Sequence, residues 1–250
     1  MLIYFVFTME IILFKDYGLA NYTLIEGFPG AGLVGPMAVS YMVEKLNMEY
    51  AGYIESELFP PIAAVHGGAP MHVARLYVDQ KDRLIVALSE FMIPVNAVYQ
   101  LGKELLSFIR KNNISRIISI GGMPAQKLSG IAYMISSDQS AIRKGSGLKT
   151  IQEGVIAGVS AVLATGAKDF GIPTTTLLVE VNPMIMDPKY AEIAIQGLQK
   201  LIGLQIDLSD LEKEAQKVEA KVRDVMKKTK DSHDHYTKAT EEAAGPSMYA

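Results

Sequence analysis

The sequence predicts an α/β protein with three layers, in which helices cover both faces of a mainly parallel sheet. Three observations predict this class: short apolar runs alternate with helical patterns over residues 1–206, this region is rich in Gly, Ala, Ile, Val and Met, and turn signals stand between helix ends and new strands. Strands that alternate with helices form right-handed crossovers and parallel sheets. A chain of 250 residues can bury such a core without disulfides.

Apolar periodicity places the elements of this body. Five short apolar runs are expected to form strands, at residues 23–27, 73–78, 84–88, 116–120 and 175–181. Four segments carry apolar residues at helical spacings of three and four, at residues 33–46, 95–111, 155–169 and 188–202. Residues 48–57, which Gly52 interrupts, are expected to form a poor strand. For the first eight residues we expect either an extension before a second Met or an edge strand.

Composition excludes several classes of function. The net charge of -3 creates no field that would attract nucleic acid or an anionic membrane. The apolar stretch at residues 1–7 is far shorter than the roughly 20 residues that span a bilayer. The chain has no cysteine, which excludes thiolate zinc sites and Cys nucleophiles and suits a cytoplasmic protein.

Charge divides the chain near Gln205. Charged residues make up about 16% of residues 1–206 but about 41% of residues 207–250. We expect an α/β body at residues 1–206, an oligomerisation helix at residues 207–230 and a flexible tail at residues 231–250. The tail has few large aliphatic residues, so it cannot bury enough surface to order itself.

The predicted C-terminal helix carries an apolar residue at alternating spacings of four and three. This heptad seam comprises Leu204, Leu208, Leu211, Ala215, Val218, Val222 and Val225. Ser209 and Glu212 form a capping-box pattern at its start. Such a narrow stripe fits a helix pair or bundle better than a broad sheet, so we expect self-association through it. The alternative is an amphipathic helix that folds back on the body.

A glycine-rich turn follows the first predicted strand. Gly30, Gly32 and Gly35 match the GxGxxG pattern of dinucleotide sites, and a predicted helix begins there. Pro29 and Pro36 stiffen the turn, and Pro36 deletes an N–H near the helix start. We therefore favour a packing role for these glycines over cofactor binding, and expect no cofactor.

The sequence shows no catalytic constellation and no metal site. His66 and His72 are six residues apart, which matches neither HExxH nor a metal pair on one helix turn. Ser89 and Glu90 follow a predicted strand, but no nucleophile elbow surrounds them. Further carboxylates near predicted strand ends are Glu26, Glu55, Glu57 and Glu180.

Several separated motifs resemble the proteasome assembly chaperone family, in particular its second-chaperone branch with archaeal homologues. They are EGFPGAGLVG at residues 26–35, LFPP at 58–61, SEFMIP at 89–94, IGG at 120–122 and GVIAG at 154–158. The resemblance covers roughly residues 24–202 and implies a non-enzymatic α/β fold and an archaeal source.

The resemblance also gives meaning to the last three residues. Met248, Tyr249 and Ala250 look like the hydrophobic-Tyr-X terminus of proteins that dock on the proteasome core particle. The resemblance implies that Met248 enters an apolar part of a groove between α subunits, that Tyr249 inserts its ring, and that the Ala250 carboxylate pairs with a basic side chain.

The resulting hypothesis is a cytoplasmic, non-catalytic homo-oligomer, a tetramer or pentamer, that binds the proteasome α ring through its C-termini. The sequence does not separate an assembly chaperone from an activator that works without ATP. An alternative is a nucleotide- or nucleoside-handling enzyme that uses the glycine-rich turn. A third reading is an adaptor for some other complex.

Overall fold

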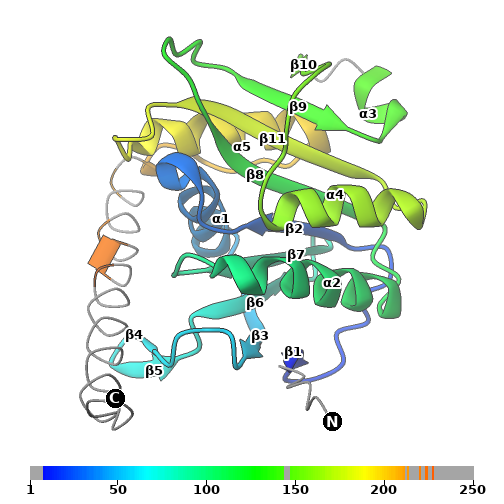
Figure 1. Cartoon of the computed structure of the whole chain (residues 1–250), viewed down its shortest axis with the longest axis vertical. Helices are drawn as coiled ribbons and strands as arrows, with labels where there is room; N and C mark the ends of the chain where they lie inside the picture. The colour runs from blue at the N-terminus through cyan, green and yellow to red at the C-terminus, as the bar shows by residue number, and fades with distance from the viewer. Residues whose placement is uncertain are drawn as a thin grey trace, which may run out of the picture.

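The computed structural model describes residues 8–143 and 147–211, together with residues 213, 220, 223, 224 and 227. Its centre is a nine-stranded sheet with the order β1-β3-β6-β7-β2-β8-β11-β9-β10 (Figure 1). The strands are β1 (Met9–Leu13), β2 (Thr23–Gly27), β3 (Glu49–Ser56), β6 (Ala74–Asp79), β7 (Leu84–Ser89), β8 (Arg116–Pro124), β9 (Ala132–Ser136), β10 (Lys149–Thr150) and β11 (Thr174–Val181). A separate hairpin contains β4 (Ala64–His66) and β5 (Ala69–Met71).

The centre of the sheet is parallel and much of the rest is antiparallel. Strands β7, β2, β8 and β11 run parallel to one another, whereas β1, β3, β6 and β7 pair antiparallel, as do β9 and β11. The prediction of a mainly parallel sheet is therefore only partly confirmed. Residues 80–83 alone connect β6 to β7, and so short a link closes a hairpin but cannot make the crossover that parallel neighbours need.

Helices lie on both faces of the sheet, which confirms the predicted three layers. Helices α1 (Val34–Lys45) and α5 (Pro188–Ile202) pack on one face with a continuous apolar cluster. Helices α2 (Val95–Lys111) and α4 (Val159–Asp169) pack on the other face with a second cluster. In β2, Ile25 faces the first cluster and Leu24 the second, so this central strand is buried on both faces, as parallel strands usually are.

Local sequence sets where the helices begin and end. The segments predicted at residues 95–111 and 188–202 are α2 and α5. The Asp187 carboxylate accepts the Lys189 N–H at 2.9 Å, and Gly203, at a φ of 74°, ends α5. Helix α4 begins at Val159 rather than at residue 155, because Gly158 holds a φ of 76° that is not helical. A short helix, α3 (Gln139–Arg143), follows β9.

The antiparallel edge was the least visible part of the sequence. Residues 48–57 contain β3, a full strand of eight residues rather than a poor one. Gly52 permits it, because a Cβ there would overlap the carbonyl group of Ile12 in β1. The prediction for the first eight residues falls mostly on residues 1–7, which lie outside the described chain. Within the described residues, no helix is both long and apolar enough to cross a membrane.

Candidate functional site

The glycine-rich turn between β2 and α1 is shaped by packing. It passes through a short 3-10 helix, η1 (Ala31–Leu33), in which Gly32 has a φ of 64°. A Cβ at Gly32 would lie 3.0 Å from the Val181 side chain, and a Cβ at Gly35 would lie 2.7 Å from the Ile120 carbonyl oxygen. Of the three glycines in the GxGxxG motif, only Gly30 faces open space, with no atom within 4 Å of such a Cβ. The protein's own atoms therefore occupy the space beside Gly32 and Gly35.

Glu26, at the end of β2, is a buried carboxyl group that links the sheet to α4. Only 1% of this residue is exposed. The Ser160 hydroxyl donates to its carboxyl group at 2.6 Å, and the Phe28 N–H donates at 3.2 Å. Burial raises the pKa of Glu26 above its ordinary value, and these two donors and Ser119 oppose the rise. The position of this group inside the protein indicates a structural link.

The two histidines face different partners. The His66 Nε2 lies 2.8 Å from the Glu90 carboxylate, which also pairs with Arg75. Arg75 is only 3% exposed, and its Nε has no hydrogen-bond partner among the described atoms. The His72 ring instead stacks on Tyr53, with 3.5 Å between ring centroids. The described residues contain no group of three or more metal-ligating side chains.

The remaining strand-end carboxylates are spread over separate environments. The Glu180 carboxylate accepts the Ser129 N–H at 2.6 Å, and hydrogen bonds from Ser129 lower its pKa. Glu55 and Glu57 are exposed on and after β3, near the antiparallel edge of the sheet. The carboxyl groups of Glu26, Glu90 and Glu180 therefore bond to different partners, namely Ser160, Arg75 and Ser129.

The start of the heptad seam packs on the body of the same chain. Leu204 and Leu211 are buried in the cluster formed with α1 and α5, and Leu208 is partly buried against it. The Tyr41 hydroxyl in α1 donates to the Asp207 carbonyl oxygen at 2.6 Å. Lys45 pairs with Asp210 at 2.8 Å. These three leucines therefore contact the body of their own chain, as expected from the alternative in which the helix folds back on the body.

The rest of the seam and the terminal motif lie outside the described residues, namely Ala215, Val218, Val222 and Val225, and Met248, Tyr249 and Ala250. At the predicted capping box, the Ser209 N–H and hydroxyl both donate to the Asp207 carboxylate at 3.0 Å. Asp207 therefore orders the turn that leads to Leu211. Self-association through the seam and docking by the terminus both stay predictions.

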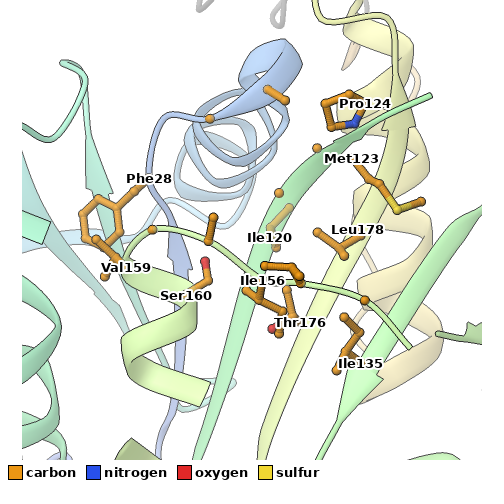
Figure 2. A pocket seen from close by; sticks show the side chains of 18 of the residues that line it. Phe28, Ile120, Met123, Pro124, Ile135, Ile156, Val159, Ser160, Thr176 and Leu178 are labelled. Carbon is orange, nitrogen blue, oxygen red and sulfur yellow. The ribbon is translucent and has the colours of Figure 1, made fainter. Parts of the chain in front are cut away.

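A cavity of about 520 Å³ lies at the carboxyl ends of the parallel strands. Its walls come from the segments that follow β2 and β7, from the end of β8, and from residues 151–158, which connect β10 to α4. Figure 2 shows residues such as Ile156 and Ser160 on one side, with Thr176, Leu178 and Ile135 on strands behind them. The chain leaves β2 toward one face of the sheet and β7 toward the other, and ligands of open α/β sheets bind at such a point.

Comparison with known proteins finds a matching family, a related sequence and a similar solved structure. The model of the PAC2 family matches residues 24–226. The uncharacterized protein MJ0106 of Methanocaldococcus jannaschii is 26% identical over 205 residues, which cover 82% of this chain and 85% of that protein. The crystal structure of Pyrococcus furiosus PbaA, described as an archaeal homolog of proteasome-assembly chaperone, has 26% identity and a TM-score of 0.78, and covers 91% of this chain and 100% of that one.

A second solved structure supports the fold alone. Pyrococcus furiosus PbaB, described as an archaeal proteasome activator, is 22% identical with a TM-score of 0.72. The alignment covers 87% of this chain and 98% of PbaB. The α/β body is thus shared with proteins of this group over nearly their whole length.

Proposed function

Because the chain belongs to the PAC2 family, we propose that it is a non-catalytic protein that binds the proteasome core particle, as an assembly chaperone or as an activator that works without ATP. The observation that carries this proposal is the family match over residues 24–226, joined to the likeness to PbaA over that whole chain. PbaA and PbaB are described as a homolog of an assembly chaperone and as an activator, so the family supports both roles.

In this proposal the C-terminus makes the contact. Met248, Tyr249 and Ala250 dock in grooves between α subunits of the core particle, with the Tyr ring as the anchor. Tyrosine suits this role because it offers a large contact area with only two side-chain torsions to fix. A three-residue terminus buries little surface, so a single copy binds weakly.

Several copies on one oligomer make the binding strong. A homo-oligomer, for which we propose four or five subunits, presents its termini together. Once one terminus is seated, the others experience a high effective concentration, and avidity rises by about 10² to 10⁴ if the tails span neighbouring grooves. The seam from Leu204 to Val225 holds the subunits together through its later positions, since Leu204 and Leu211 already pack on their own body.

The enzyme alternative is not favoured. The turn that would hold a nucleotide is filled at Gly32 and Gly35 by the side chain of Val181 and the backbone of Ile120. The Glu26 and Glu90 carboxyl groups are buried and hydrogen-bonded within the protein. A thermal-shift screen against nucleotides tests this alternative directly, and we expect no nucleotide to raise the melting temperature.

Removal of the terminus tests the proposal. Deletion of residues 248–250 and the change Tyr249→Ala should abolish co-purification with core particles while the oligomer mass in light scattering stays unchanged. Tyr236→Ala is the matched control, because it removes another tyrosine of the same tail and should bind as the wild type does. Binding by the truncated chain at wild-type strength would overturn the docking mechanism.

Hydrolysis of a small peptide by the core particle separates the two roles. A faster rate that depends on Tyr249 identifies an activator. Binding that depends on Tyr249 without a faster rate identifies an assembly chaperone.

A further inference from the structure

A second cavity lies next to the cavity at the strand ends. The second cavity has a volume of about 540 Å³ and shares Ile135, Ile156 and Thr176 with the first as common walls. Both volumes fall in the range of about 300–1,000 Å³ that is usual for small-molecule sites. We call residues 151–158 the strap, because Figure 2 shows this segment passing in front of the strands. The strap contains no helix or strand of its own.

The first cavity is aliphatic. Ile135, Leu178 and the strap residue Ile156 point into it, as Figure 2 shows. Gly121 of β8 leaves room there, since a Cβ at this position would meet only the Leu178 side chain, at 3.6 Å. Aliphatic side chains of this kind stabilise a ligand that buries apolar surface against them. They suit an alkyl chain.

The second cavity is polar at its far end. Ser136, Ser137 and Thr174 line it, and their hydroxyl groups already bond to one another's strands. Lys168, in the last turn of α4, also lines this cavity and is exposed. Among the ion pairs of the described residues, none includes Lys168. This ammonium group is therefore available to an anion.

Charge sets the direction of a ligand that spans both cavities. Glu153 of the strap lines the first cavity and would repel an anionic group there. Lys168 lines the second cavity and would attract one. A ligand with a carboxylate at one end and an alkyl chain at the other matches this arrangement, with its carboxylate at Lys168 and its chain passing Ile156 into the aliphatic cavity.

We propose that these two adjacent cavities together bind a single-chain aliphatic carboxylate of the fatty-acid class. This site is separate from the C-terminal residues of the docking mechanism, and its occupation does not depend on core-particle binding. The ligand would hold the strap against Thr176 and Leu178.

Calorimetric titration of the full chain with octanoate and decanoate tests the site. Decanoate should bind once per chain, and its affinity should exceed that of octanoate by up to about 15-fold, because each buried methylene contributes about 0.8 kcal/mol. Decyltrimethylammonium, which has a similar chain and the opposite charge, should bind at least tenfold more weakly. Absence of saturable decanoate binding, or equal binding of the cation, would overturn the proposal.

Two pairs of variants locate the site. Gly121→Leu fills the aliphatic cavity and should remove decanoate binding, whereas Ser107→Leu adds the same side chain at an exposed position of α2 and should not. Lys168→Gln should weaken decanoate binding by about tenfold, as loss of a charge-assisted contact does, while Lys111→Gln, a matched change in the last turn of α2, should leave it unchanged. Lys168 is exposed, so its variant keeps the test valid even if Gly121→Leu does not fold. Unchanged binding by Lys168→Gln would overturn the assignment.

Discussion

The change Gly35→Ala tests whether the glycine-rich turn is built for packing or for a ligand. A Cβ at residue 35 would lie 2.7 Å from the Ile120 carbonyl oxygen and 3.0 Å from the Gly27 Cα. Favourable contacts lie at about 3.5–4.0 Å, so α1 would have to move away from β2 and β8. Both neighbouring atoms belong to backbone in the centre of the sheet, and neither can rotate away.

The magnitude follows from two opposing effects. Overpacking of a core costs about 1–3 kcal/mol, while the preference of a helix for alanine over glycine returns up to about 1 kcal/mol. We expect a net loss of about 1–2 kcal/mol in the free energy of unfolding, which lowers the melting temperature of a chain of this size by about 2–8 °C.

Gly30→Ala is the matched control within the same motif. A Cβ at Gly30 would meet no atom within 4 Å, and its φ of -155° suits any residue. We expect its melting temperature, followed by circular dichroism, to stay at or slightly above that of the wild type. A wild-type melting temperature for Gly35→Ala, or an equal loss in both variants, would refute the packing explanation.

Three further changes test the contacts that position the rest of the molecule. Leu211→Ala should lower the free energy of unfolding by about 2–5 kcal/mol, because this residue is 2% exposed in the α1/α5 cluster. Leu128→Ala, at a 48% exposed position, should change the free energy of unfolding by less than about 0.5 kcal/mol. A similar loss for both variants would show that the start of the heptad seam does not pack on the body. Glu90→Gln leaves the buried Arg75 without its carboxylate and should lower the free energy of unfolding by about 3–5 kcal/mol. Glu49→Gln, in an exposed pair with Lys15, should lower it by at most about 1 kcal/mol. Urea denaturation measures both losses, and equal losses would contradict a buried ion pair between Arg75 and Glu90. Glu26→Gln removes a carboxyl group whose pKa is raised by burial, so the folded wild type keeps its proton to higher pH than the unfolded chain, and its free energy of unfolding should fall relative to the variant as pH rises from the ordinary pKa of Glu through the raised one. A difference that does not vary with pH would mean that Glu26 titrates alike in both states.

Apolar periodicity predicted the buried centre of the fold well. Strand β2 and helices α2 and α5 have the predicted bounds, because their neighbours bury them on a regular period and caps such as Asp187 and Gly203 mark their ends. The three layers followed from this alternation.

The strands at the edges of the sheet were harder to predict, because their sequences show little apolar periodicity. Strand β3 contains Gly52 at an irregular point in its pairing with β6, and β10 has only two residues. Their positions depend on which distant strand they meet, which local sequence does not encode.

Only part of the candidate site could be predicted. The packing role preferred for Gly32 and Gly35 agrees with their contacts, since flanking prolines already argued against a nucleotide loop. The sequence gives only a weak indication of the buried ion pair between Arg75 and Glu90, because Arg75 is a charged residue inside the predicted strand at residues 73–78. The cavity gave no such signal, because its walls come from segments as distant as Phe28 and Val159.

The measurement that tests the central claim most directly is a binding curve for labelled protein and intact core particles, recorded by analytical ultracentrifugation for the wild type, Tyr249→Ala and Tyr236→Ala. Because several weak termini act together, we predict at least about a 100-fold loss of affinity for Tyr249→Ala and none for Tyr236→Ala. Equal affinity of the wild type and Tyr249→Ala would contradict docking through the C-terminus.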